Sequence, residues 1–280
     1  MKTNKIRVTI LNGNRVVKLN QNNLDECIRF INEENISYVK IDDDIDQYSD
    51  LNFLNECNNI KYLSFANHFI NDISAIKNLK LEILALHDTK APINIGELKN
   101  LKTLYITWYK KIEGLGEVDN LNELNIWSYA PKSRDIDEIA KLKNLRFLSI
   151  TQSKIDSLNG IANLNQLKSL QLNYLRTLTQ INEIESVTSL EKLEIESCKN
   201  IEDFSKIKRL NYLYELNLFK CGEIESINFI NELSNLKNFA FYETNVKDGD
   251  ISPCMNIKNV WFDNKKHYSH KNTEFNNVFD

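Results

Sequence analysis

Residues 145–172 read LRFLSITQSKIDSLNGIANLNQLKSLQL, and this stretch decides the fold of the chain. It contains one complete unit, Leu145-x-x-Leu148-x-Ile150, and begins the next at Leu167. The spacing of two between Leu148 and Ile150 is typical of a strand whose alternate side chains point inward. Apolar residues then recur every third position, which predicts a short helical or 3₁₀ segment. One strand and one return segment, closed within 22 residues, predict one turn of a solenoid.

The same unit recurs along almost the whole chain. Its first apolar residue stands at Ile36, Ile60, Leu81, Leu101, Leu121, Leu145, Leu167, Leu190, Leu213, Leu236 and Ile257. Successive units begin 20 to 24 residues apart. A period this constant predicts stacked repeats and not a set of separate globular domains.

This pattern resembles the leucine-rich-repeat family, whose consensus is L-x-x-L-x-L-x-x-N/C with a period of about 20–29 residues. The short repeats, and apolar residues at every third position of the return, are most similar to the bacterial, internalin-like subclass. The resemblance covers residues 36–262. It implies an α/β solenoid: a leucine-rich-repeat horseshoe with about eleven parallel strand turns on the concave face and short helical or 3₁₀ returns.

One position departs from the family pattern. The ninth position, usually Asn, is held in successive turns by Asp44, His68, Thr89, Tyr109, Tyr129, Ser153, Leu175, Cys198, Cys221, Thr244 and Lys265. In the family this Asn hydrogen-bonds backbone where the chain leaves the strand, and Tyr and Leu cannot do so in the same way. We therefore expect the turns that begin at Leu101, Leu121 and Leu167 to bend outward locally.

The two ends differ from the repeats. Residues 5–20 predict a hairpin around Asn12-Gly13, and a helix is expected from Leu24 to about Glu34. We interpret 1–35 as an N-terminal cap, 36–262 as the solenoid and 263–280 as a C-terminal tail. The tail is polar except for Tyr268, Phe275, Val278 and Phe279. It partly covers the last turn, is disordered, or docks on another molecule, and we favour a cap on the last turn.

Composition excludes several classes of protein. The net charge of −4 and pI near 5.7 give no case for binding nucleic acid or an anionic membrane. Five scattered cysteines do not form a disulfide or zinc framework. The chain has no apolar run typical of a signal peptide or a membrane span. We expect a cytoplasmic protein, unless a signal peptide has been removed.

Motifs for catalysis are missing from the sequence. It contains no P-loop, G-x-G-x-x-G, H-E-x-x-H or G-x-S-x-G. His267 and His270 lie three residues apart in the tail. We favour a solvent-exposed tail over a metal site as the interpretation of this pair. Cys198 and Cys221 hold equivalent positions in adjacent turns, and we interpret them as buried side chains. We expect no enzyme activity, no cofactor and no metal.

The resemblance implies that residues beside the fourth and sixth motif positions face solvent on the concave side. In the early turns these positions include Tyr38, Tyr62, Ile83, Ala85 and His87. The middle turns carry an aromatic group: Tyr105, Trp108, Tyr109, Trp127, Tyr129 and Phe147. Exposed aromatic patches usually mark binding sites. The alternative is that several rings, especially Tyr109 and Tyr129, fold back into the turn.

The later turns carry an acidic stretch. Glu194, Glu196, Glu215 and Glu243 have only Lys192 and Lys220 as nearby opposing charges. Such a stretch suits a basic partner surface, although an ordinary solvated face explains it equally well. The predicted partner-binding residues are Tyr105, Trp108, Trp127, Tyr129, Phe147, Glu194, Glu196, Glu215, Phe219 and Tyr242.

These features favour a non-catalytic scaffold that binds a protein partner on the concave face. An intracellular inhibitor of the immunity-protein type is one specific form, and the acidic stretch would suit a basic target. The alternative is a secreted or surface adhesion protein of the internalin type, which requires export. A hydrolase that uses Glu194, Glu196 and Glu215 ranks third, and nucleic-acid binding ranks last. A monomer is slightly favoured over an oligomer.

Overall fold

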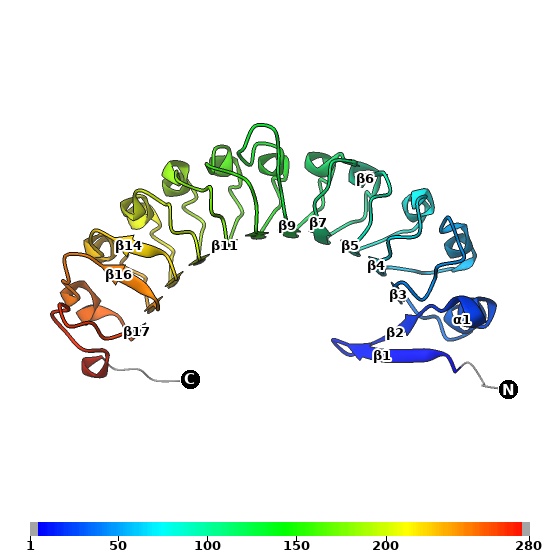
Figure 1. The fold of residues 1–280 in the computed structure, drawn as a ribbon, viewed down its shortest axis with the longest axis horizontal. Helices are drawn as coiled ribbons and strands as arrows, with labels where there is room; N and C mark the ends of the chain where they lie inside the picture. The colour runs from blue at the N-terminus through cyan, green and yellow to red at the C-terminus, as the bar shows by residue number, and fades with distance from the viewer. Residues whose placement is uncertain (1–4, 276–280) are drawn as a thin grey trace. The chain divides into compact units, whose positions relative to one another are not determined.

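A computed structural model describes residues 5–275 of the chain. The chain divides into two compact units, Met1–Leu124 and Asn125–Asp280, and strand β9 (Glu123–Trp127) spans their boundary. In each unit, strands lie along one side of the repeats and short helical turns along the other (Figure 1). Val278 and Phe279 of the predicted tail lie outside the described residues.

The sheet of the first unit begins with an antiparallel hairpin and continues in parallel pairs. Its strands, in spatial order, are β1 (Arg7–Leu11), β2 (Asn14–Lys18), β3 (Tyr38–Ile41), β4 (Tyr62–Ala66), β5 (Ile83–His87) and β7 (Thr103–Thr107). A second, smaller sheet pairs β6 (Ile93–Asn94) with β8 (Ile112–Glu113) on the return side.

The sheet of the second unit consists of parallel pairs. After β9 its strands are β10 (Phe147–Thr151), β11 (Ser169–Asn173), β12 (Lys192–Glu196), β13 (Glu215–Phe219), β15 (Asn238–Phe241) and β17 (Asn259–Phe262). Here too a small sheet pairs two return segments, β14 (Gly222–Ile224) and β16 (Thr244–Val246).

The returns are short 3₁₀ segments, as the three-residue spacing predicts. In the first unit they are Asn52–Glu56, Ser74–Asn78, Ile95–Glu97 and Leu115–Glu117. In the second they are Ile139–Lys141, Ile161–Asn163, Asn182–Ser186, Phe204–Arg209, Asn228–Glu232 and Ser252–Asn256. Two further 3₁₀ segments lie outside the repeats, Gln21–Asn23 in the cap and Asn272–Glu274 in the tail. Helix α1 (Leu24–Glu33) follows the hairpin, so both predicted N-terminal elements are confirmed.

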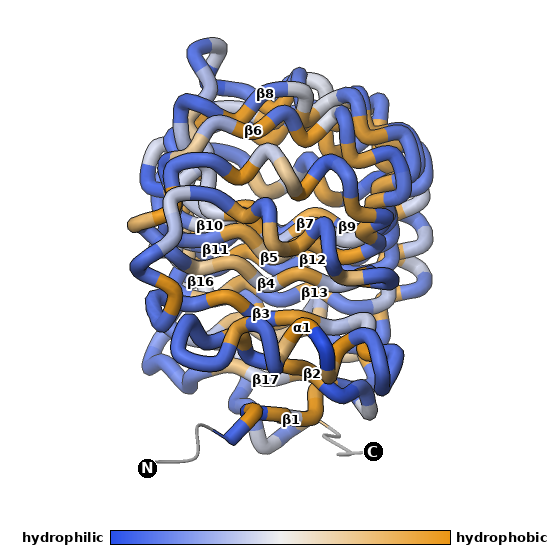
Figure 2. Tube along the Cα trace, turned by 90° about the vertical axis from the view of Figure 1, so that its right-hand side faces the viewer, coloured by the Kyte–Doolittle hydropathy of each residue, from blue (hydrophilic) through white to orange (hydrophobic). Residues whose placement is uncertain are grey.

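All eleven predicted strands are present, and each begins two residues after the first apolar residue of its motif. The motif side chains form columns, since Leu148 pairs in register with Leu170 and Ile150 with Leu172. These four side chains are fully buried. Burying a leucine or isoleucine contributes about 1.5–3 kcal/mol, so the columns and the buried apolar residues of the returns together build the core. Figure 2 shows the hydrophobic residues recurring along the strands.

In three turns of the second unit, the side chain at the ninth position turns inward and bonds to the preceding turn. The Cys221 thiol donates to the Ile195 carbonyl at 3.2 Å, and the Thr244 hydroxyl donates to the Leu218 carbonyl at 2.8 Å. Cys198 makes the equivalent bond, and each of the three reaches back 26 residues. Cys and Thr therefore do here what Asn does in the family pattern.

The ninth position of the second turn is not the residue that counting predicts. His68 is exposed, whereas Asn67 is fully buried. The Asn67 amide donates to the carbonyls of Asp42 and Ile45 at 2.9 and 2.7 Å. Its Oδ1 accepts from backbone N–H groups two and three residues later, at 2.9 and 3.0 Å. The strand exit is one residue shorter here, which brings the asparagine into the bonding position.

The predicted outward bend is wrong for the turn that begins at Leu167. Leu175 is fully buried, and strand β11 keeps an unbroken five-residue register with β10 and with β12. An apolar ninth side chain needs no hydrogen-bond partner, so it packs inward without displacing the strand. Tyr109 also turns back, and its hydroxyl donates to the Ala91 carbonyl at 2.6 Å.

The described part of the tail lies against the last turn. The Tyr268 and Phe275 rings meet the Phe262 ring edge-on, with centroids 5.9 and 5.7 Å away. The Tyr268 hydroxyl accepts a hydrogen bond from the Val246 N–H at 3.0 Å. These contacts cover apolar rings that the last strand of a solenoid would otherwise expose.

Candidate functional site

A hollow of about 310 Å³ opens on the strand face of the first unit. The tip of the β1–β2 hairpin and the strands β3, β4, β5 and β7 line it, and we call it the strand-face groove. Its nine lining residues are Leu11, Asn12, Asn14, Tyr38, Tyr62, Ile83, Ala85, His87 and Tyr105. None of these nine residues is acidic, lysine or arginine, so the groove is suited to an apolar group.

The groove follows from the size of the side chains on successive strands. Tyr38 and Tyr62 occupy paired positions on β3 and β4, and their rings stack with centroids 5.0 Å apart. On β5 the position that pairs with Tyr105 of β7 is the small Ala85. Because Ala85 fills little space beside these rings, the floor of the face is hollow there. Ile83 pairs with Tyr62.

Two titratable groups in the groove remain neutral at pH 7. The Tyr105 hydroxyl donates to the Glu123 carboxylate at 2.8 Å, and burial, with this bond, raises the pKa of Tyr105 to about 12. His87 lies 2.9 Å from the Thr107 hydroxyl through its Nδ1. Burial lowers the pKa of His87 below its ordinary value, so its imidazole carries no charge.

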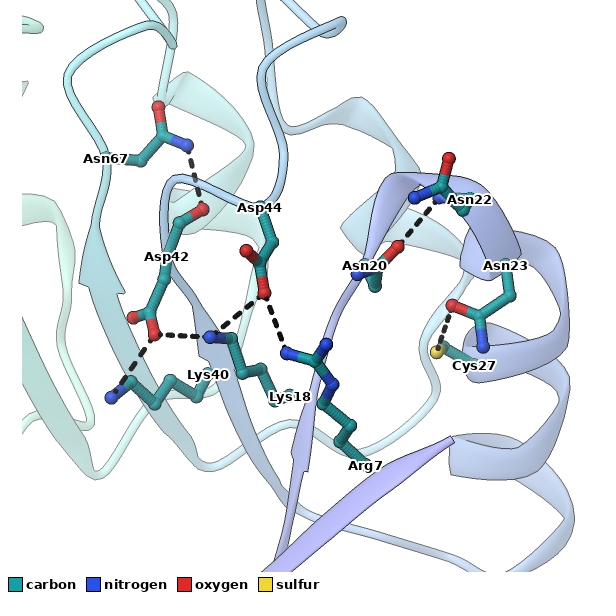
Figure 3. Close-up of polar contacts among 10 residues, drawn as sticks. All are labelled: Arg7, Lys18, Asn20, Asn22, Asn23, Cys27, Lys40, Asp42, Asp44 and Asn67. Atoms are coloured by element: carbon teal, nitrogen blue, oxygen red, sulfur yellow. Dashed lines mark hydrogen bonds and ion pairs between the residues drawn. The ribbon is translucent and has the colours of Figure 1, made fainter. Parts of the chain in front are cut away.

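Ion pairs join the open end of the hairpin to residues just after β3 (Figure 3). Arg7 of β1 lies 3.2 Å from Asp44, and Lys18 of β2 lies 3.0 Å from both Asp42 and Asp44. Lys40 completes the network at 3.4 Å from Asp42. The Asp44 and Asp42 carboxylates raise the pKa of Lys18 despite its partial burial. Single pairs of this exposure contribute little stability. Together with the parallel pairing of β2 with β3, they hold the open end of the hairpin, opposite its tip, against the first repeat.

The predicted aromatic group is divided between the two units. Tyr105 and Trp108 are half-buried in the first unit, and Trp127 and Phe147 are half-buried in the second. Tyr129 is fully buried, so its assignment to an exposed binding patch is wrong. It holds the ninth position of its turn, where side chains point into the core, and burial raises its pKa well above the ordinary value.

The acidic stretch of the second unit is partly neutralised. Glu215 pairs with Lys192 at 3.0 Å, and Glu196 lies 3.9 Å from Lys220. Glu194 is half-buried, and burial, with the nearby Glu196 charge, raises its pKa. On adjacent strands each of these three glutamates lies opposite a residue other than an acid. The sheet register therefore avoids direct repulsion between them.

Phe219 and Tyr242 are the remaining predicted binding residues. Their rings lie 6.1 Å apart, between centroids, and Tyr242 is 39% exposed. They form a small aromatic pair beside the acidic stretch of the second unit. Among residues 5–275, no group of three or more His, Cys, Asp or Glu side chains could hold a metal ion. None of the helices in this range has the length and hydrophobicity needed to cross a bilayer.

Comparison with solved structures identifies the fold. An internalin of Listeria monocytogenes aligns over 91% of this chain and 83% of its own, with 19% identity and a TM-score of 0.56. A leucine-rich-repeat protein of Leptospira interrogans aligns over 83% of this chain and 63% of its own, with 20% identity and a TM-score of 0.59. The chain has the leucine-rich-repeat fold. No family model and no curated protein matches the sequence.

Of the groove residues, only Tyr105 is among the partner-binding residues that the sequence predicts. The repeat motif places Tyr38, Tyr62, Ile83, Ala85 and His87 on the strand face, and the hairpin tip belongs to the predicted cap. The available signal was the recurrence of tyrosine at the same motif position in the first two repeats, followed by smaller residues in the third.

Proposed function

We propose that this leucine-rich-repeat chain is a non-catalytic scaffold that binds a protein partner through the strand-face groove. The observation that carries the proposal is the groove itself: uncharged, lined by three tyrosines and bounded by a fixed hairpin. Such a surface fits one apolar side chain of a partner, with the Asn12 side-chain amide at its rim for the partner's backbone.

The acidic stretch and the Phe219–Tyr242 pair of the second unit supply further polar and aromatic contacts to the same class of partner. A partner with a basic surface fits this stretch. The finer form of the proposal is an inhibitor of the immunity-protein type that acts in the cytoplasm. It rests on analogy with other repeat proteins, and the identity of the partner decides it.

The test begins with capture of partners from a lysate of the native cells, followed by calorimetry with the purified partner. Tyr62→Ala removes a groove ring, and Ala85→Leu fills the hollow without removing a contact. Tyr212→Ala is the matched control, because Tyr212 is 65% exposed and does not line the groove.

We expect each groove variant to weaken binding about 30-fold, the size of an interface hot spot, and Tyr212→Ala to leave it unchanged. Far-UV circular dichroism and thermal melting confirm that all three variants fold. Equal binding by wild type and both groove variants would overturn the groove as the binding site.

A further inference from the structure

Strand β1 is an exposed apolar edge. All five of its residues are exposed, including Ile10 at 69%, Leu11 at 41% and Val8 at 38%. β1 is the outermost strand of its sheet, and within residues 5–275 its only strand partner is β2. An open edge of this kind presents backbone donors and acceptors to any strand that can pair with it.

The hairpin turn determines which backbone groups face the open edge. Asn12 and Gly13 both have positive φ, 48° and 79°, as in a type I′ turn. Such a turn makes the residues that flank it, Leu11 and Asn14, a hydrogen-bonded pair. Because these pairs alternate along an antiparallel ladder, the N–H and C=O groups of Val8 and Ile10 point away from β2.

The last strand of the second unit, β17, is covered by residues of the tail, unlike β1. The Asn272 side chain donates to the Phe262 carbonyl at 3.1 Å, and the Phe275 ring packs on Phe262. Tail residues therefore cover β17, whereas the described N-terminal residues leave β1 uncovered. Arg7 is a charged edge residue of the kind that discourages pairing, but Asp44 of the same molecule neutralises it.

We propose that β1 pairs antiparallel with β1 of a second copy, which gives a symmetric dimer. With Val8 on the two-fold axis, Ile10 of one copy lies opposite Ile6 of the other. Ile6, Val8 and Ile10 then form one apolar row, since alternate residues share a face. On the opposite face Arg7 lies opposite Thr9, so no like charges meet.

Self-complementarity is the reason to assign a second copy to this edge. Reversing the strand about Val8 matches apolar residues with apolar residues and a basic residue with a neutral one, as an isologous interface requires. The outward backbone groups of Val8 and Ile10 coincide with the hydrogen-bonded positions of that register. The inference does not depend on the groove: Leu11 is the residue of β1 that lines the groove, whereas the proposed row of Ile6, Val8 and Ile10 lies on the other face of the strand.

The dimer is expected to be weak. One short strand pair buries well under the ~1,200 Å² of a stable interface, so the dissociation constant should fall between about 1 μM and 1 mM. Sedimentation velocity of the full chain across this range of concentration measures it directly. Ile10→Lys places a charge in the apolar row. Tyr212→Lys is the control, because it changes a residue of similar exposure, 65% against 69%, away from the edge.

We expect wild type and Tyr212→Lys to dimerise alike, and Ile10→Lys to associate at least about tenfold more weakly. Amide hydrogen exchange supplies a backbone test. The amides of Val8 and Ile10 should exchange more slowly as concentration rises, while those of Thr9 and Leu11, already bonded to β2, should not change.

A chain that stays monomeric throughout this range would overturn the proposal. So would a dimer that survives Ile10→Lys while circular dichroism shows a folded variant, because another surface would then join the copies. Pairing of β1 with a strand of a different protein, in a chain that is monomeric alone, would equally reject the second copy as its occupant.

Discussion

Replacing Asn67 by alanine should lower the free energy of unfolding by about 3 kcal/mol. Two of the four Asn67 hydrogen bonds are fully buried, to the Ile45 carbonyl and the Ile70 N–H, and each contributes about 1 kcal/mol. The other two, to Asp42 and Phe69, are partly buried and contribute about half as much each, because water can replace the lost partner.

His68→Ala is the matched control, since counting along the motif assigns His68 to the same position. Its ion pair with Asp43 spans 3.1 Å, with both side chains more than half exposed, and its removal should change stability by less than about 0.5 kcal/mol. Urea unfolding followed by circular dichroism measures the free energy of unfolding of both variants. The comparison is valid if the slope of this free energy against urea concentration is the same as in wild type. A loss below about 1 kcal/mol for Asn67→Ala, or a larger loss for His68→Ala, would refute the hydrogen-bond account.

Three other perturbations test the structure. Gly114→Ala should lower the melting temperature far more than Gly222→Ala, although both glycines have positive φ. A Cβ at Gly114 would overlap the Asn94 side chain and lie 2.8 Å from the Gly96 nitrogen. A Cβ at Gly222 would lie 3.6 Å from its nearest neighbouring atom. His87→Gln should reduce the loss of stability as pH falls below about 6.5, because the lowered pKa of His87 makes protonation favour the unfolded chain. Burial raises the pKa of all five cysteine thiols, so a thiol reagent should titrate them only after urea unfolding, and rapid reaction of the native chain would contradict that burial.

The positions of the strands could be predicted from sequence because one physical requirement repeats in every turn. Each motif must direct two or three apolar side chains to the same face of a strand. Because alternate residues of a strand share a face, apolar residues two apart identify both the strand and its buried face. Leu148 and Ile150 therefore mark a strand without knowledge of any distant contact. The returns follow similarly, since their three-residue spacing matches a 3₁₀ turn.

The predictions that the structure contradicts concern positions where the sequence pattern fits two arrangements equally well. At positions 67 and 68 an asparagine and a histidine are adjacent, and a shift of one residue decides which is buried. Asn has both the donor and the acceptor that the site needs, so its chemistry was a better guide than counting. Tyr129 shows the converse, because an aromatic side chain suits a core and an exposed patch equally well.

The groove could not be predicted because it depends on contacts between distant parts of the chain. Leu11 and Tyr105 line the same hollow although more than ninety residues separate them. The strand-face positions of its tyrosines were available from the motif, but the hairpin tip is brought beside them by the parallel pairing of β2 with β3. No local pattern in the sequence encodes that pairing.

The ninth-position bonds of the second unit all run in one direction along the chain. Leu172, Ile195 and Leu218 each offer a carbonyl that is bonded by a side chain 26 residues later, in the next turn but never in an earlier one. During synthesis on the ribosome, each of these three carbonyls therefore lacks its side-chain donor until the following turn has emerged.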